Sequence, residues 1–249
     1  MNLRLLRHQL RFELLTYLRN PGGVFFTIGL PVLLLVIFTS LNQDDVDPVS
    51  GRSFGSYFVP GMLTFGVIST TYGNLAGRLV FRRESGLLKR ARSTPLPPSI
   101  LVAGMLANAA IVAVATAAIV LGVGRIAYNV ALPTDWLLTT VVLILGSTSF
   151  AALGMAMATF VPNVDAADPI AFGTLLPVLF ISGVFQQVPT TSILNTIATV
   201  FPVKHLFDAA LATSGPISGD PRVNLLIVGA WGLAGGIVAV RHFRWEPTR

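Results

Sequence analysis

The sequence predicts an all-α integral membrane protein with six transmembrane helices. Hydrophobic residues make up 53% of the 249 residues and charged residues only 11%, whereas soluble chains carry roughly 25% charged residues. So few charges cannot cover a soluble globule of this length, and the mean hydropathy is +0.73. Six apolar runs contain no Asp, Glu, Lys or Arg, and each is close to the length of about 20 helical residues that crosses a bilayer.

The elements follow one another without a low-complexity linker, so residues 1–249 are expected to form a single transmembrane domain. Residues 1–21 predict an amphipathic helix on the membrane surface. Its apolar side holds Leu3, Leu6, Leu10, Leu14 and Tyr17, and its basic side holds Arg4, Arg7, His8, Arg11 and Arg19. The spans are expected at residues 22–41, 56–77, 99–124, 136–161, 169–188 and 223–240. No small-residue cleavage site follows the first span, so it is expected to remain as an anchor.

The long connection 189–220 lies between the fifth and sixth spans and contains two amphipathic pieces separated by Pro202. Each piece is too short to cross the bilayer. A crossing would also bring Lys204 and Asp208 into the membrane, at about 2.5–3.5 kcal/mol for one charge. We therefore expect an external re-entrant segment made of two short helices.

The positions of Lys and Arg predict that both termini lie in the cytoplasm, because basic residues accumulate in cytoplasmic loops. With the N-terminus inside, all but four of the 17 Lys and Arg residues fall on the cytoplasmic side. The exceptions are Arg52, Arg125, Lys204 and Arg222. Topology also accounts for the net charge of +6, so we expect no nucleic-acid partner, which would require a basic face.

No constellation typical of an enzyme or a metal site is present. The chain has no cysteine, and its histidines fall in three separate segments, at His8, His205 and His242. The acidic patch of Asp44, Asp45 and Asp47 could attract a cation, but it lacks the spaced oxygen ligands of a calcium loop. We therefore expect no catalytic residue, no metal site and no cofactor site in this chain.

The chain also lacks the residues that energise transport by itself. No span carries an ionisable residue of the kind used in proton or ion relays. Both lysines, Lys89 and Lys204, lack the glycine that precedes the lysine of a phosphate-binding loop. Energy for transport must therefore come from a partner.

Two kinds of small or polar residue within the spans indicate helix packing. Asn74 and Asn108 are expected to hydrogen-bond between helices, with contact to a substrate as the alternative. The small-residue pairs at spacing of four are Gly232 with Gly236 and Gly154 with Ala158. Such pairs are typical of close helix contact.

The stretch FRRESGLLKRARSTPLPP, residues 81–98, concentrates basic residues between the second and third spans. Its final prolines predict a break, so residues 84–92 are expected to form a short helix at the membrane surface. Such a helix cannot bury an apolar side by itself. We therefore expect this segment to dock on a partner.

The order of these features resembles the type-2 ABC exporter permeases, the membrane subunits of daunorubicin-resistance and related drug, lipid and polysaccharide exporters. The resemblance covers nearly the full length. It includes the loop RESGLLKRARSTPL after the second span, and SGVFQQVP followed by FPVKHLFDAAL before the sixth. Leu87 and Lys89 stand where the family often has Thr and Glu, so this loop is more basic than usual.

The resemblance implies the ABC-2 (type V exporter) fold in a bacterial plasma (inner) membrane. Two permease halves, identical or paralogous, would pair with two copies of a cytoplasmic ABC ATPase that binds ATP and Mg. The chain itself would not be an enzyme. Segment 81–98 would be the coupling helix, with contacts to the ATPase from Arg83, Glu84, Gly86, Leu87, Leu88, Lys89, Arg90 and Arg92.

The resemblance further implies a substrate path between the halves, lined mainly by the first, second and fifth spans. A hydrophobic or amphipathic substrate, such as a drug or lipid, would leave the cytoplasm along it, as in multidrug efflux. The candidate lining residues are Phe25, Phe26, Phe58, Phe65, Asn74, Phe172 and Phe180. The phenylalanines could instead face lipid. Polysaccharide or sodium export, or a non-transporting membrane scaffold, are the alternative functions.

Overall fold

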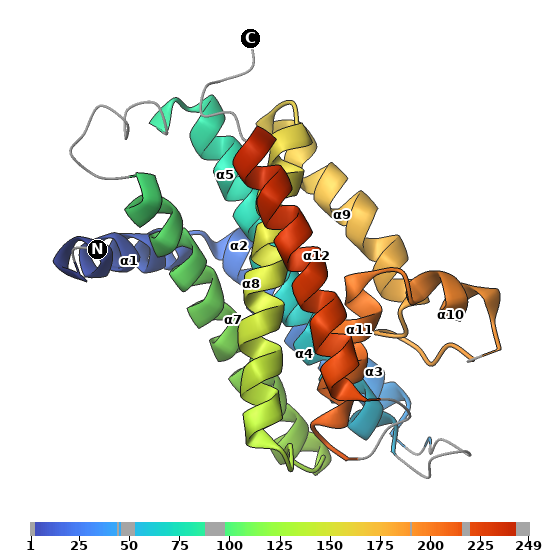
Figure 1. Ribbon diagram of the computed structural model, residues 1–249. Coiled ribbons are helices and arrows are strands. Elements are labelled where there is room, and N and C mark those ends of the chain that lie inside the picture. The colour runs from blue at the N-terminus through green and yellow to red at the C-terminus, as the bar shows by residue number, and fades with distance from the viewer. Residues whose placement is uncertain are drawn as a thin grey trace.

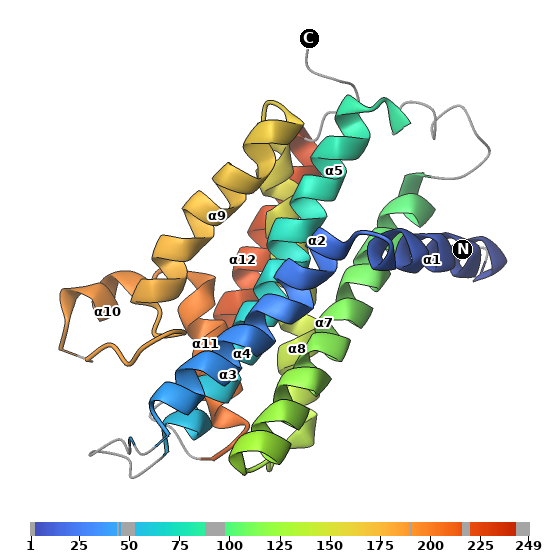
Figure 2. The same ribbon diagram turned by 180° about the vertical axis from the view of Figure 1, so that it is seen from behind.

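Helices make up the regular secondary structure of the computed structural model. The structure describes residues 3–43, 45, 53–87, 98–189, 191–215 and 220–242, and within these ranges there is no strand. The predicted fold class, an all-α membrane protein, is confirmed. Figure 1 and Figure 2 show a bundle of long helices with α1 (Leu3–Leu18) lying across it.

The first long helical stretch joins α2 (Pro21–Val24), the π-helical η1 (Phe25–Gly29) and α3 (Leu30–Leu41). The second joins α4 (Phe54–Ile68), the π-helical η2 (Ser69–Asn74) and α5 (Leu75–Glu84). Next come α7 (Pro98–Tyr128), α8 (Trp136–Phe160) and α9 (Val164–Ile181). The short helices α10 (Ile193–Ala198) and α11 (Pro202–Ala212) precede α12 (Pro221–His242).

Five of the described helices are long and apolar enough to cross a membrane: Pro21–Leu41, Ile100–Tyr128, Trp136–Phe160, Val164–Ile181 and Pro221–His242. The stretch α4–η2–α5, which holds the predicted second span, is not among them. It is the central helix of the bundle, because α4 packs against α3, α7, α8 and α11. A helix that faces protein tolerates the polar residues of η2, and its crossing of the membrane stays a prediction.

Helix α9 begins earlier than the expected fifth span. Its first residue is Val164, because the Asn163 side chain accepts a hydrogen bond from the Ala166 amide at 2.9 Å and caps the helix. The helix ends at Ile181, before Gly183 with φ 84°. Asp165 and Asp168, expected in a loop, therefore lie on the helix.

The segment between α9 and α12 contains two short helices, as expected. Figure 1 places α10 and α11 far from the C-terminal end of α12. Helix α11 packs against α12 and α4, and Leu206 and Phe207 on it are buried. Lys204 Nζ donates to Asp208 Oδ1 at 2.7 Å, so the two charges of this helix compensate each other.

Small residues bring α8 and α12 together. A Cβ on Gly232 would lie 2.5 Å from Ser149 Oγ, and one on Gly235 would lie 2.9 Å from Leu153 Cδ2. Gly236, the expected partner of Gly232, has nothing within 4 Å of its Cβ position. The contact therefore uses Gly232 and Gly235 in place of the pair at spacing of four. Gly154 contacts the Tyr72 carbonyl of η2 in the same close manner.

Candidate functional site

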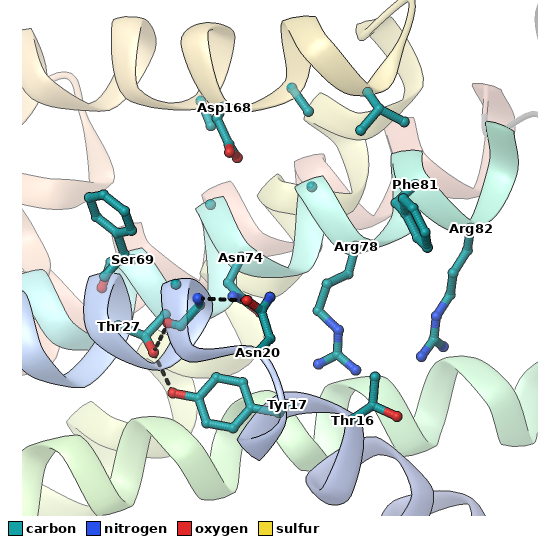
Figure 3. Close-up of a pocket in the computed structure, with 18 of the residues that line it drawn as sticks. Thr16, Tyr17, Asn20, Thr27, Ser69, Asn74, Arg78, Phe81, Arg82 and Asp168 are labelled. Atoms are coloured by element: carbon teal, nitrogen blue, oxygen red, sulfur yellow. Dashed lines mark hydrogen bonds between the residues drawn. The ribbon is translucent and has the colours of Figure 1, made fainter. Parts of the chain in front are cut away.

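A cavity of about 690 Å³ lies between α1, the first span, the α4–η2–α5 stretch and α9 (Figure 3). Residues of the first, second and fifth predicted spans line it, together with the end of α1. These are the spans for which the resemblance implied a substrate path.

The wall formed by α9 is a stripe along one helix face. It runs from the start of the helix through Asp168, Phe172, Leu175 and Leu179, at helical spacings of four, three and four. Such spacing keeps the side chains on one face. Beyond the Asp168 carboxylate the stripe continues with apolar side chains only.

The opposite wall, formed by α4, η2 and α5, also has one apolar end and one charged end. The chain runs along it in the direction opposite to α9. From the apolar end it runs through Phe65, Ser69, Asn74, Arg78 and Arg82. Its charged residues therefore lie toward the same end of the cavity as Asp168, and Figure 3 shows Ser69, Asn74, Arg78 and Arg82 in this order. The cavity has a charged end and an apolar end.

The candidate lining residues fall into two groups. Those that line the cavity are Phe26, Phe65, Asn74 and Phe172. The ring centroids of Phe26 and Phe172 are 6.0 Å apart, so these two side chains bring the first span and α9 into contact.

The other three candidates do not line the cavity. Phe58 is fully buried in the core, with ring centroids 5.0 Å from Phe54 and 5.5 Å from Phe38. Phe25 and Phe180 are about half exposed, at 48% and 51%. Their exposure agrees with the alternative that some of these phenylalanines face lipid.

A buried ion cluster forms the charged end and joins α1 to α5. Glu13 is fully buried. Arg82 binds it with two bonds, Nη1 to Oε1 at 2.7 Å and Nη2 to Oε2 at 2.8 Å. Arg78 Nη2 also donates to Oε2, and Gln9 Nε2 donates to Oε1 at 2.7 Å. The sequence indicated a topology signal for both arginines and placed Arg82 in the expected docking segment 81–98. It indicated no partner for Glu13.

The rest of α1 has the expected two sides. Leu6, Leu10 and Leu14 are half-buried and Tyr17 is buried. The basic residues of the opposite side, Arg4, Arg7, His8, Arg11 and Arg19, are exposed. Glu13 lies on the apolar side, since it is three residues after Leu10 and four before Tyr17.

Polar contacts fix the junction between α1 and the first span. Tyr17 Oη and Thr27 Oγ1 share a hydrogen bond, and burial raises the pKa of the Tyr17 hydroxyl, so it stays protonated. Asn20 Oδ1 accepts from the Gly23 amide at 3.1 Å and caps α2. A Cβ on Gly23 would lie 2.9 Å from Asn20 Nδ2 and 3.2 Å from Asn74 Nδ2. Asn74 therefore reaches this junction, while Asn108 is buried within α7 with Oδ1 unpaired among the described residues.

Both π-helical segments lie in the cavity wall. Phe26 and Thr27 come from η1, and Ser69, Gly73 and Asn74 come from η2. Isolated π-helical turns are rare and are frequently found at functional sites. The two π-helical segments are therefore consistent with a functional role for this cavity.

The expected coupling residues start at the end of α5. Arg83 is buried and binds the carbonyls that end α8, with Nη1 to Ala158 O at 3.1 Å and Nη2 to Val161 O at 2.6 Å. Its Nε also donates to Glu84 Oε1 at 3.0 Å. Arg83 thus contacts its own chain here.

The remaining coupling residues are only partly described. The short helix was expected from residue 84, but Glu84 ends α5 and Gly86 turns the chain with φ 68°. Leu87 is exposed and also lines the cavity. Leu88, Lys89, Arg90 and Arg92 lie outside the described residues.

The described residues contain no metal-binding cluster. No set of three or more His, Cys, Asp or Glu side chains there could hold a metal ion. Within the acidic patch, Asp45 is described, and Asp44 and Asp47 are not. His205 has a structural environment, with Nδ1 2.8 Å from Asn224 Oδ1 and Nε2 2.8 Å from Thr199 O.

Comparison with known proteins agrees with this architecture. The chain is 25% identical over 153 residues to the transport permease YvfS of Bacillus subtilis (strain 168), covering 61% of this chain and 62% of that protein. It is 20% identical over 157 residues to the inner membrane transport permease YadH of Escherichia coli (strain K12), covering 62% of this chain and 60% of that protein. The matched part spans less than two thirds of the length of these relatives.

The family is shown by a longer match. Residues 4–214 match the model of the ABC-2 type transporter, from the start of α1 to the end of α11. This range contains every helix that lines the cavity. The chain belongs to the ABC-2 type transporter family.

Proposed function

We propose that this chain is the membrane-spanning permease subunit of an ATP-driven exporter, which moves a hydrophobic or amphipathic substrate out of the cytoplasm. The observation that carries the proposal is the cavity between the first, second and fifth spans, with its charged and apolar ends. Pockets for small ligands typically combine a mainly apolar lining with a few polar groups. The relatives' names describe transport permeases, which supports a non-enzymatic membrane subunit.

A separate ABC ATPase supplies the energy in this proposal and binds ATP and Mg. Two ATPase copies act on two permease chains, a second copy of this chain or a paralogue, in a bacterial inner membrane with both termini cytoplasmic. The family membership supports such a partner in general. The segment 81–98 is its docking site.

The structure suggests how motion at this segment reaches the cavity. Arg78 and Arg82, on the last turns of α5, hold α1 through Glu13. Arg83, the next residue, holds the end of α8 beside the start of α9. A displacement of the end of α5 would therefore act on both α1 and α9, which both line the cavity.

Reconstitution tests the proposal. The chain is placed in vesicles with its ABC ATPase partner, identified by co-purification, and ATP-dependent movement of a fluorescent amphiphile is measured. Phe172→Ala, which opens the cavity wall, is expected to reduce movement at least about tenfold. Phe180→Ala is the control, since Phe180 lies on the same helix outside the cavity.

Three results would contradict the proposal. Movement without the ATPase, driven by a proton gradient, would show a secondary carrier. Equal effects of Phe172→Ala and Phe180→Ala would remove the cavity from the path. Absence of ATP-dependent movement of any amphiphile, with the complex assembled, would favour a scaffold.

A further inference from the structure

The two ends of the cavity differ in chemistry and are well separated. Along α9, Leu179 follows Asp168 by eleven residues, which places it about 16 Å further along the helix axis. Phe65 and Leu179 line the apolar end, and Arg78 lies at the charged end with Asp168. A ligand that fills the cavity must therefore have a polar head and an apolar chain.

The arginines at the charged end are incompletely compensated. Arg82 uses both of its Nη atoms on Glu13. Arg78 uses one Nη atom on the same carboxylate, and 15% of its side chain remains accessible. Two guanidinium groups face one carboxylate, so the cluster keeps an excess positive charge. Arg78 is the member of the cluster that can donate to a ligand.

The carboxylate on the facing wall is also available. Asp168 is exposed and makes no hydrogen bond or ion pair with any residue that the structure describes. Its Oδ1 lies 3.4 Å from the position of a Cβ on Gly77, which is the residue before Arg78. Because Gly77 has no side chain, nothing from α5 covers the carboxylate at this point. Asp168 can therefore accept a cationic group of a ligand.

We infer that the cavity binds an amphiphile with a zwitterionic head group, its cationic group at Asp168 and its phosphate or carboxylate at Arg78. The apolar chain runs along the cavity past the contacting rings of Phe26 and Phe172 toward Leu179. This inference rests on the proposed function and names the substrate class of the cavity. A purely cationic head would meet the excess positive charge of the arginines, and a purely anionic head would meet Asp168.

Four detergents with the same dodecyl chain separate the head-group classes. They are dodecylphosphocholine, dodecyl phosphate, dodecyltrimethylammonium and dodecyl maltoside. The protein is held in an amphipol and titrated by calorimetry below the critical micelle concentrations. We expect dodecylphosphocholine to bind about tenfold more tightly than each of the others. Equal affinities, or tightest binding of another head group, overturn the inference.

Matched variants assign the cationic group to its residue. Asp168→Asn is expected to lower the affinity for dodecylphosphocholine about tenfold, to the level of dodecyl phosphate. Asp165→Asn removes the same charge from the first turn of the same helix, where the side chain is exposed and outside the cavity. It should leave every affinity unchanged. Equal effects of the two variants, or no effect of Asp168→Asn, overturn the assignment.

A second variant covers the possibility that Asp168→Asn fails to fold. Gly77→Thr keeps all charges and places side-chain atoms over the Asp168 carboxylate. It should reduce the preference for dodecylphosphocholine in the same direction, and an unchanged preference contradicts the inference. These measurements need no ATPase. A failure here therefore leaves ATP-driven transport standing, and a failure of transport with binding intact overturns the proposed function alone.

Discussion

Arg82 and Glu13 form a two-bond ion pair across the junction between α5 and α1, with distances of 2.7 and 2.8 Å. Both residues are buried, Glu13 fully. Parallel bonds from one guanidinium to one carboxylate fix geometry as well as adding energy. The helix that lies across the bundle is therefore attached to the second helical stretch at a defined point.

Loss of the Glu13 carboxylate should be strongly destabilising. Glu13→Gln leaves Arg78 and Arg82 buried without their counter-charge, and breaking a buried pair in this way typically costs about 3–5 kcal/mol. The variant should unfold at lower denaturant concentration than the parent protein in the same detergent. Arg11→Gln, an exposed change on the same helix, is the control. Equal midpoints for all three proteins would contradict a structural role for the cluster.

Gly232 and Gly236 of the last helix should respond to substitution in opposite ways. Gly232→Ala puts a methyl group 2.5 Å from Ser149 Oγ and 2.7 Å from Ser149 Cα, so α8 and α12 must separate. Overpacking of this kind costs about 1–3 kcal/mol. Gly236→Ala adds its methyl group in open space and should stabilise the helix by roughly 0.5–1 kcal/mol. Thermal unfolding of the two variants measures the difference, and a destabilised Gly236→Ala would show that another surface covers that position.

Orientation in the membrane can be measured cleanly, because the chain has no cysteine. Thr196→Cys places a thiol on exposed α10, and Asp165→Cys places one in the first turn of α9. With both termini in the cytoplasm, a membrane-impermeant maleimide added to intact cells should label position 196 and spare position 165. Labelling of 165 in place of 196 would reverse the topology.

The docking segment should tolerate no helix breaker. Position 88 lies outside the described residues, and its prediction comes from the sequence: a short helix followed by prolines. Leu88→Pro should cost about 3 kcal/mol of local helix stability without affecting insertion of the spans. We expect normal amounts of protein in the membrane with loss of substrate-stimulated ATP hydrolysis in the complex. Full hydrolysis by a well-expressed variant would reduce the segment to a topology signal.

The fold class followed from composition, because contact with lipid imposes an average property that a sequence displays directly. The rule that spans contain no charged residue gave a wrong start for one span. It placed the start of the fifth span at 169, immediately after Asp168, whereas the cap at Asn163 starts α9 earlier. Asp168, which lines the cavity, was therefore assigned to a loop. Capping chemistry at 163 was the available signal.

The polar partners of the site were less predictable. Glu13 pairs with Arg78 and Arg82, which lie 65 and 69 positions later in the chain. Sequence periodicity describes one helix at a time, so it cannot predict a partner on a distant helix. Its own position was informative, since it is the first acidic residue of the chain and lies on the apolar side of α1. The phenylalanines show the same limit. Phe25 and Phe26 are adjacent in sequence and similarly exposed, at 48% and 49%, yet only Phe26 lines the cavity. Successive residues of a helix point in different directions, and the sequence alone does not say which direction meets α9.

The π-helical segment η2 has a consequence for everything that follows it on the same stretch. A π-helical hydrogen bond spans one residue more than an α-helical one, and one inserted residue corresponds to about 100° of rotation around an α-helix axis. The azimuth of Arg78 and Arg82 is therefore set by residues 69–74 upstream of them. Removing one residue there would leave each guanidinium chemically intact while turning it to another side of α5. The rotation of α5 about its own axis therefore decides whether its arginines point toward α1.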